Sequence, residues 1–381
     1  MNKGLTELVQ QLVAIRSLNP PGNENEIANF AKDFLVQNGI QAQLVPLEEG
    51  RSSVVGRIPG KGKGCIVVCG HLDTVGISEG QWTKPPFDGV IENGKLFGRG
   101  AADMKGGVAI ALESARQISK LGEKPEKSIV LALTADEEWQ YRGAASIVAS
   151  GLIDDCEFLI VTEPTDSVPY IGQKGELWVE VLLTGKAAHG SVPQEGIDTI
   201  QPGAEFCLRL AERIRELPPL PARGETTLTI GQFQGGWRIN IVADQAKIGL
   251  DIRVACEEHK TLILEYIQQL GNEIAARTRV GFSSQVTSYN PPIASDPDGE
   301  YVSQFVETAL GGEFSAENVG LVPYYTDAGM IVPKLDVPVI VFGPGRIAQA
   351  HQPDEYLELD SLEKAFGILM KCLVRASKLP I

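Results

Sequence analysis

Histidine and carboxylate side chains follow several short apolar runs in this sequence. His71 and Asp73 come directly after the apolar run at residues 65–69. Imidazole and carboxylate are the groups from which proteins build sites for Zn²⁺ and similar cations. The spacing of these two residues suits a metal ligand, because a nearby carboxylate can hold the imidazole in one tautomer and raise its basicity.

The same residue types occur at four further places. Asp103 lies in the glycine-rich turn 98–107, Glu137 and Glu138 follow the run 128–133, Glu163 follows the run 158–161, and His351 comes shortly after the run 337–342. The acids have ordinary alternatives: Asp103 could cap a helix, Glu137 and Glu138 could be solvated acids at a helix start, and Glu163 could lie in an ordinary turn before Pro164. Adjacent acids at a strand end nevertheless repel each other unless a cation lies between them. The set as a whole predicts a hydrolytic site for two cations at one edge of a sheet.

Other catalytic chemistries have weaker support. The turn Gly98-Arg99-Gly100 lacks the third glycine of a dinucleotide-binding motif, and no Walker A sequence occurs. His259 is predicted to be structural, at the exposed start of a helix. His189 lies in a short polar loop with glycines on both sides, and the residues alone leave its role open.

The elements that position these residues alternate between strand and helix. Short apolar strands at 65–69, 128–133 and 158–161, with helices at 104–119 and 143–150 between them, predict an α/β domain with a mostly parallel sheet. From residue 176 the expected order becomes strand, helix, strand, strand, helix, strand, which is ferredoxin-like. We therefore expect residues 1–175 and 290–381 to form a metal-binding catalytic domain, and residues 176–289 to form an inserted α+β domain.

Composition excludes several classes of partner. The chain has 34 Lys and Arg against 49 Asp and Glu, a net charge of −15 that opposes binding to nucleic acid or to an anionic membrane. Its apolar runs are far shorter than the ~20 residues that span a bilayer. The first residues lack the apolar segment of a signal peptide. The 6 cysteines contain no Cys-x-x-Cys pair, which predicts reduced core residues. Together these features predict a cytoplasmic protein.

Taken in order, five stretches resemble a known family: GHLDTV, GRGAADMKGG, ADEE, EPT and AHQPDEYLE. They are similar to the M20-type dinuclear-zinc deacylase and peptidase family, to which acetylornithine deacetylase and succinyl-diaminopimelate desuccinylase belong. The resemblance covers nearly the whole chain. It implies a zinc-exopeptidase-like catalytic domain and an inserted ferredoxin-like domain that serves as lid and in dimerisation.

The resemblance also implies two Zn²⁺ per subunit, for which Co²⁺ can substitute, and it assigns roles motif by motif. His71 and Glu163 would bind one metal, Glu138 and His351 the other, and Asp103 would bridge them, with Asp73 orienting His71 and Glu137 acting as the general base.

Three residues of the inserted domain complete the implied site. In dimeric members of the family this domain pairs across a two-fold axis, and a histidine matching His189 reaches the other subunit's active site to stabilise the oxyanion. Asn240 and Arg253 resemble the residues that hold the substrate carboxylate, a role for which the planar guanidinium is well suited. The chain is thus expected to be a homodimer with a small-molecule substrate.

The implied activity is metal-dependent hydrolysis of the amide bond of an N-acyl-L-amino acid. The run 343–356 is particularly similar to the acetylornithine deacetylase branch, so N-acetylornithine is the leading substrate. One stretch departs from that branch: Thr326-Asp327-Ala328 stands where several of its members carry Thr-Glu-Ala. Succinyl-diaminopimelate, another N-acylamino acid or a dipeptide therefore stay open as substrates. A non-catalytic homologue that binds metal or amino acid is a remote alternative.

Overall fold

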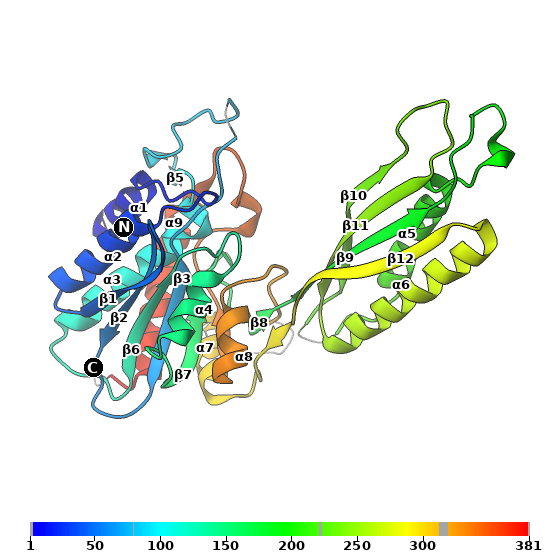
Figure 1. Cartoon of the computed structure of the whole chain (residues 1–381). Helices are drawn as coiled ribbons and strands as arrows, with labels where there is room; N and C mark the ends of the chain where they lie inside the picture. The colour runs from blue at the N-terminus through cyan, green and yellow to red at the C-terminus, as the bar shows by residue number, and fades with distance from the viewer. Residues whose placement is uncertain (1–2, 79, 221–222, 312–318, 380–381) are drawn as a thin grey trace. The chain divides into compact units, whose positions relative to one another are not determined.

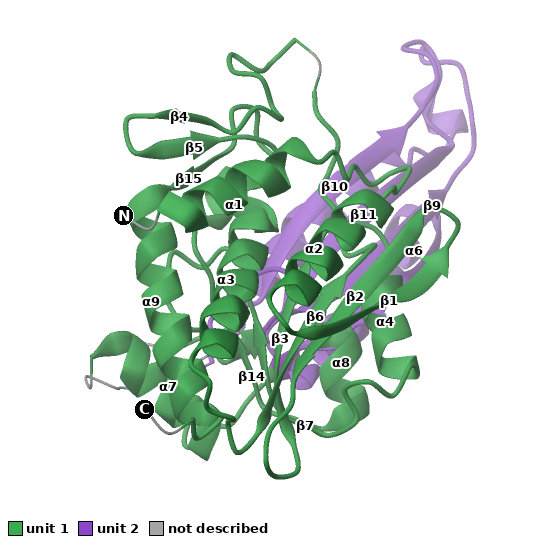
Figure 2. Ribbon diagram, turned by 90° about the vertical axis from the view of Figure 1, so that its left-hand side faces the viewer, with its two compact units in different colours: residues 1–172, 294–322, 326–381 green, residues 173–293, 323–325 purple. Residues whose placement is uncertain are grey.

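The chain divides into two compact units, the second of which is inserted into the sequence of the first. The computed structural model describes residues 3–78, 80–220, 223–311 and 319–379, and Figure 1 shows their helices and strands. Unit 1 comprises Met1–Gly172, Ala294–Val322 and Thr326–Ile381, and unit 2 comprises Gln173–Ile293 and Pro323–Tyr325 (Figure 2). Among the described residues, every helix is too short or too polar to span a bilayer.

A six-stranded sheet forms the centre of unit 1. Its strands lie in the order β1 (Gln41–Glu48), β2 (Arg51–Ile58), β6 (Ser128–Thr134), β3 (Cys65–His71), β7 (Cys156–Val161) and β14 (Val339–Val341). The last four run parallel to one another, whereas β1 and β2 are antiparallel. Every side chain of β3 and β6 is buried, as expected of strands covered on both faces. The predicted mostly parallel α/β sheet is confirmed.

Two groups of helices pack on this sheet. One group consists of α1 (Lys3–Ala14), α2 (Asn25–Gln37), α3 (Gly106–Lys120), α7 (Glu300–Leu310) and α9 (Leu359–Ala376) (Figure 2). In this group α1, α2 and α9 contact α3, and α7 contacts α9. The other consists of α4 (Arg142–Ala149) and α8 (Ala328–Leu335), which contact each other. In α9 the buried residues Leu362, Ala365 and Leu369 recur at the helical spacing of one apolar face. Hydrophobic burial of such faces therefore holds the helices on the sheet.

A small three-stranded sheet lies beside this core. It contains β4 (Val90–Glu92), β5 (Lys95–Phe97) and β15 (Tyr356–Glu358), with Tyr356 opposite Phe97. The sequence analysis predicts neither this sheet nor β1 and β2. In β1 the pattern is mostly exposed or half-buried, and the buried part of β2 begins with Arg51, Ser52 and Ser53. Buried polar residues of this kind form no apolar pattern in the sequence. Their partners come from distant segments, so the local sequence does not show that they are buried.

Unit 2 has the predicted ferredoxin-like order. It contains β9 (Gly175–Thr184), α5 (Ile200–Arg215), β10 (Thr227–Gly235), β11 (Gln245–Val254), α6 (Glu257–Thr278) and β12 (Gly281–Asn290), and the antiparallel strands lie in the order β10, β11, β9, β12. The short strands β8 (Gly172–Gln173) and β13 (Ile293–Ala294) lie where the chain enters and leaves this unit. His259 is buried and lies 2.9 Å from Thr226 Oγ1, so its predicted exposure is wrong although its structural role fits this contact.

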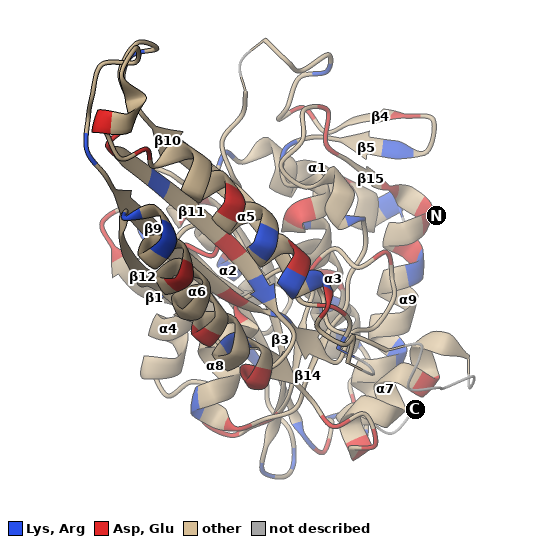
Figure 3. Cartoon of the chain, turned by 90° about the vertical axis from the view of Figure 1, so that its right-hand side faces the viewer, with Lys and Arg blue, Asp and Glu red and all other residues tan. Residues whose placement is uncertain are grey.

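Charged residues of both signs alternate along the two helices of unit 2 (Figure 3). Arg209 on α5 pairs with Glu273 on α6 at 2.7 Å, and Arg277 on α6 pairs with Glu205 on α5. Such intermingling is typical of solvated helix faces. All 6 cysteines of the chain are buried and unpaired, as the sequence predicts.

Two helix glycines provide a matched test of how closely unit 1 is packed. A methyl group at Gly107 in α3 would lie 2.0 Å from the carbonyl oxygen of Thr162, whereas at Gly367 in α9 nothing lies within 4 Å. We expect Gly107→Ala to lower the free energy of unfolding by about 1–3 kcal/mol through overpacking. Gly367→Ala should raise it by about 0.5–1 kcal/mol, because alanine loses less conformational entropy in a helix. Urea unfolding followed by circular dichroism measures both, and equal effects would contradict the close packing of α3 on Thr162.

Candidate metal centre

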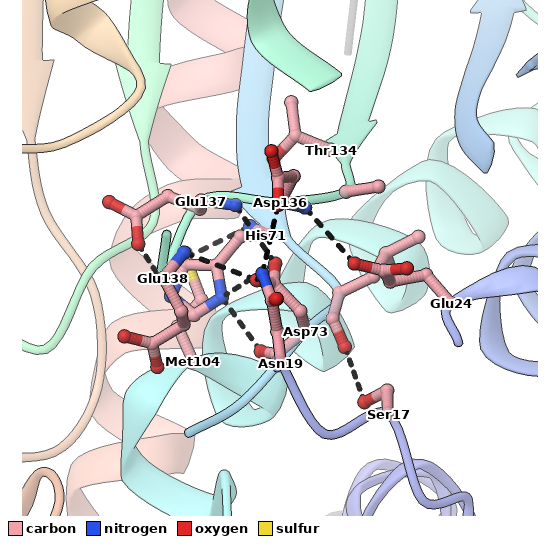
Figure 4. Close-up of polar contacts among 12 residues, drawn as sticks. Ser17, Asn19, Glu24, His71, Asp73, Met104, Thr134, Asp136, Glu137 and Glu138 are labelled. Carbon is pink, nitrogen blue, oxygen red and sulfur yellow. Dashed lines mark hydrogen bonds and ion pairs between the residues drawn. The ribbon is translucent and has the colours of Figure 1, made fainter. Parts of the chain in front are cut away.

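The predicted ligands of unit 1 meet at one edge of the central sheet. His71 is the last residue of β3, Glu137 and Glu138 follow the end of β6, and Glu163 follows the end of β7. Because these strands are parallel neighbours, their carboxyl ends lie side by side. Figure 4 shows His71 and Asp73 beside Glu137 and Glu138 at this edge.

Asp103 lies between the two histidines of the site. Its Oδ1 is 3.1 Å from His71 Nε2, and its Oδ2 is 3.5 Å from His351 Nε2. Asp103 is part of a π-helical turn, η1 (Ala101–Lys105), that precedes α3, and the cap position of α3 is occupied by Lys105. The helix-cap alternative for Asp103 is therefore wrong. One carboxylate that presents a separate oxygen to each of two imidazoles has the arrangement of a bridging ligand.

Each imidazole also has a second carboxylate nearby. His71 Nε2 is 3.8 Å from Glu163 Oε1, and His351 Nε2 is 3.1 Å from Glu138 Oε2. Ligand atoms ~2.0–2.1 Å from a tetrahedral Zn²⁺ are ~3.3 Å apart, so these separations suit donors that share a cation. Ligand atoms of His71, Asp103 and Glu138 all lie within 4.8 Å of one another. The residues present therefore fit the two-cation site that the sequence predicts.

Asp73 organises this site through its backbone and its side chain. His71 Nδ1 lies 2.9 Å from the Asp73 carbonyl oxygen, which can only accept, so this nitrogen carries the proton and Nε2 keeps its lone pair for a metal. The Asp73 carboxylate accepts hydrogen bonds from the backbone N–H of Glu137 at 3.2 Å and of Glu138 at 3.1 Å. Asp73 therefore orients His71 by its carbonyl and the two glutamates by its carboxylate.

The electrostatics of the site favour the addition of positive charge. Burial raises the pKa of Glu137 and of Glu163 well above the usual range. Nearby carboxylates raise both further, since Glu163 acts on Glu137 and Asp103 acts on Glu163. Hydrogen bonds with Asp103 and Glu138 raise the pKa of His351 to about 10. Burial by itself lowers the pKa of His71, but Asp103, Glu137 and Glu163 together raise it well above its usual value. Cations would relieve the repulsion that these shifts express.

Three predicted residues belong to unit 2. His189 is exposed, and its Nδ1 lies 2.8 Å from Ser191 Oγ. Asn240 is exposed on the adjoining segment, where its carbonyl oxygen accepts the N–H of Gly190. Arg253 on β11 forms ion pairs with Glu176 at 3.2 Å and Asp251 at 2.9 Å. His189 and Asn240 thus lie on neighbouring segments, while Arg253 lies on a strand and is already paired.

The structure adds a buried polar network that the sequence analysis does not predict. Asn19 Nδ2 donates to Asp73 Oδ2 at 2.8 Å and to Asp136 Oδ1 at 3.1 Å, as Figure 4 shows. Asp136 in turn binds Arg51 at 2.7 Å, and Arg51 also binds Glu24. These residues lie outside the recognised motifs except for Asp136, which precedes the acidic pair. The network holds Asp136 in place and so supports the segment that carries Glu137 and Glu138.

Comparison with known proteins decides the family. The chain matches the family described as peptidase family M20/M25/M40 over residues 67–375. The chain belongs to this family. It is 28% identical over 401 residues to a probable succinyl-diaminopimelate desuccinylase of Staphylococcus aureus, covering 98% of the chain and 97% of that protein. It is 30% identical over 391 residues to acetylornithine deacetylase of Proteus mirabilis, covering 98% of each.

Solved structures show the same fold. A tripeptidase from Staphylococcus aureus superimposes with a TM-score of 0.80 at 21% identity, covering 98% of both chains. A dinuclear metal-binding peptidase of the M20 family from Bacillus subtilis superimposes with a TM-score of 0.75 at 17% identity, covering 99% of this chain and 98% of that one. The predicted family and enzyme class are confirmed: this M20 protein is a metallohydrolase that acts on amide bonds.

The buried network yields a test with a control on the same strand. Arg51 and Arg57 both lie on β2, but Arg51 is 3% exposed whereas the Arg57–Asp155 pair is at the surface. Arg51→Met should lower the free energy of unfolding by about 3–5 kcal/mol, because it leaves the buried Glu24 without its cation, while Asp136 keeps Arg142. Arg57→Met should lower it by less than about 1 kcal/mol. Urea titration of the metal-free proteins measures both values; a small loss for Arg51→Met would show that the network does not stabilise the fold.

Proposed function

We propose that this chain removes the acyl group from an N-acyl-L-amino acid, with N-acetylornithine as the leading substrate and ornithine and acetate as products. The proposal of hydrolysis rests on the position of Asp103, whose two carboxylate oxygens each face one imidazole. The substrate class is supported by relatives named as acetylornithine deacetylase and succinyl-diaminopimelate desuccinylase.

The proposed cofactor is a pair of Zn²⁺ ions per subunit, with Co²⁺ as a substitute. The proposed ligands are His71 and Glu163 for one ion, His351 and Glu138 for the other, and Asp103 for both. When bound, such cations polarise a substrate carbonyl and make a water molecule a better nucleophile.

Glu137 is the proposed general base. It is 7% exposed, and its Oε2 lies 4.0 Å from His71 Nε2, so it faces the site without belonging to the closest donor set. Its raised pKa suits a carboxylate that takes a proton from the attacking water and returns it to the leaving amine nitrogen. The Asp73 carboxylate holds the backbone of Glu137 and so fixes where this proton is received.

Unit 2 is proposed to supply substrate contacts and the dimer interface. His189 would stabilise the oxyanion in the partner subunit's site, and Asn240 and Arg253 would hold the substrate carboxylate. Strand β10 lies at the edge of the unit 2 sheet, and an unpaired strand edge supports pairing of this unit with a second copy. A cytoplasmic location stays a prediction.

A second substrate has support of its own. Thr326-Asp327-Ala328 departs from the Thr-Glu-Ala of several acetylornithine deacetylases, and several Staphylococcus relatives at 27–29% identity are named probable succinyl-diaminopimelate desuccinylase. The chemistry of the site is the same for both amides, so only the pocket for the acyl group and side chain distinguishes them.

A substrate panel tests this proposal directly. Chelated protein should hydrolyse none of the compounds, and added Zn²⁺ or Co²⁺ should restore cleavage because the ligand set holds the required cations. We expect the highest kcat/KM for N-acetylornithine, beside N-succinyl-diaminopimelate, other N-acetylamino acids and dipeptides. If another acylamino acid has the highest kcat/KM, the substrate assignment changes and the proposed chemistry stays. If dipeptides have the highest kcat/KM, the deacylase assignment is rejected.

Replacement of Glu137 separates catalysis from metal binding. Glu137→Ala should lower kcat by about 100- to 10,000-fold, since no other group would accept the proton. Its metal content, measured by atomic absorption, should equal that of the unchanged protein, because Glu137 is not a proposed ligand. Glu123→Ala, in the exposed segment after α3, is the control. Appreciable residual turnover in Glu137→Ala would remove Glu137 from the base role.

The same variant tests the proposed dimer. His189→Ala should itself lose about 100- to 1000-fold in kcat, the scale of a lost oxyanion donor. Mixed with Glu137→Ala under conditions where subunits exchange, it should regain part of the activity, because a hybrid would contain one site with both residues. No recovery despite confirmed exchange would show that the two residues act within one subunit.

A further inference from the structure

Glu355 is a buried acid that none of the proposed catalytic steps uses. It is 1% exposed, and its two carboxylate oxygens are bound entirely by the loop that carries Asp103. Oε2 accepts hydrogen bonds from Arg99 Nη1 at 2.6 Å and from the Gly100 N–H at 3.0 Å. Oε1 accepts the N–H groups of Ala102 at 2.9 Å and Asp103 at 3.1 Å. Three backbone donors thus converge on one carboxylate.

Strand pairing brings Glu355 to this loop. In the small sheet Tyr356 of β15 lies opposite Phe97 of β5, so the next residues, Glu355 and Gly98, also meet. The Gly98 N–H donates to the Glu355 carbonyl oxygen at 2.9 Å. Residues 98–103, here called the Asp103 loop, therefore leave the sheet beside Glu355 and turn around its carboxylate. Gly100 has a φ of +82° in this turn, a conformation that favours glycine.

Glu355 also lies four residues after His351. The same short segment thus carries one histidine that faces Asp103 Oδ2 and one carboxylate that binds the Asp103 N–H. We propose that Glu355 is a positioning residue, which fixes the Asp103 loop against the His351 segment and so sets the distance between the bridging carboxylate and its second histidine. This inference rests on the proposed metal-binding role of Asp103 and His351.

A neighbouring acid provides a matched control. The half-buried Asp354 also accepts backbone hydrogen bonds, from Thr83 at 2.8 Å and Lys84 at 3.2 Å, and its other oxygen accepts the Thr83 hydroxyl. Its partners lie in a different loop that carries none of the proposed ligands. Asp354→Asn and Glu355→Gln therefore make the same change, from carboxylate to amide, at adjacent positions with different partners. In Glu355→Gln the amide nitrogen necessarily faces two of the donors that the carboxylate satisfied.

The experiment compares the two full-length variants with the unchanged protein. Glu355→Gln should weaken Co²⁺ or Zn²⁺ binding in calorimetry by about 10- to 100-fold, the effect typical of groups that orient metal ligands. The visible spectrum of its Co²⁺ form should also change, and kcat should fall with KM unchanged. In the metal-free variant, hydrogen exchange at residues 98–103 should be faster. Asp354→Asn should keep the metal affinity and spectrum, and alter exchange only near residues 83–84.

Three results would overturn the proposal. The first is unchanged metal affinity and unchanged exchange in a folded Glu355→Gln protein. The second is a lower melting temperature with unaltered affinity and spectrum, which indicates a merely structural role. If Glu355→Gln does not fold, Glu355→Asp replaces it, because aspartate keeps the charge but is too short to reach all four donors. The third result is an unaltered metal affinity and spectrum in Glu355→Asp. If the unchanged protein binds metal but cleaves no substrate, the proposed function fails, while affinity and exchange still decide the role of Glu355.

Discussion

Repulsion among buried carboxylates is the physical constraint on which the rest of unit 1 depends. The parallel strands bring Glu137, Glu138 and Glu163 to one edge of the sheet, where low solvent access strengthens their mutual repulsion. Two imidazoles and, in the proposed function, two cations balance this charge from one side. Behind them Arg51 and Arg142 balance the charge of Asp136, and Asn19 donates hydrogen bonds to Asp73 and Asp136. The buried arginine is therefore as much a part of the site's charge balance as the histidines.

Acidic residues in this unit serve two distinct purposes. Asp103 and Glu138 face imidazoles, as ligands of a shared cation would, whereas Asp73 and Glu355 point at backbone N–H groups and shape the segments that carry the ligands. Both kinds are buried, and residue type alone does not distinguish them. The difference lies in which donors surround each carboxylate, and this follows from how distant segments pair.

This distinction marks how far the sequence could be interpreted. Apolar runs predicted the parallel strands, because strands buried on both faces are continuously apolar, and acids after them indicated the cation site. The ferredoxin-like order of unit 2 was equally accessible from its alternation. The sequence does not reveal Asn19, Arg51 and Glu355 as supports, since their partners lie 27 to 256 residues away in the chain; Glu355 even stands within a recognised motif. The polar strand β2 was missed for the same reason.

The insertion of unit 2 has a consequence for the order in which the protein can be assembled. Strand β14 pairs with β7, yet the chain between them includes the whole of unit 2. On the ribosome, where synthesis proceeds from the N-terminus, unit 2 can acquire its fold while the edge of the central sheet still awaits its last strand. His351 emerges later still. A nascent chain therefore lacks His351, one of the proposed donors, for most of its synthesis.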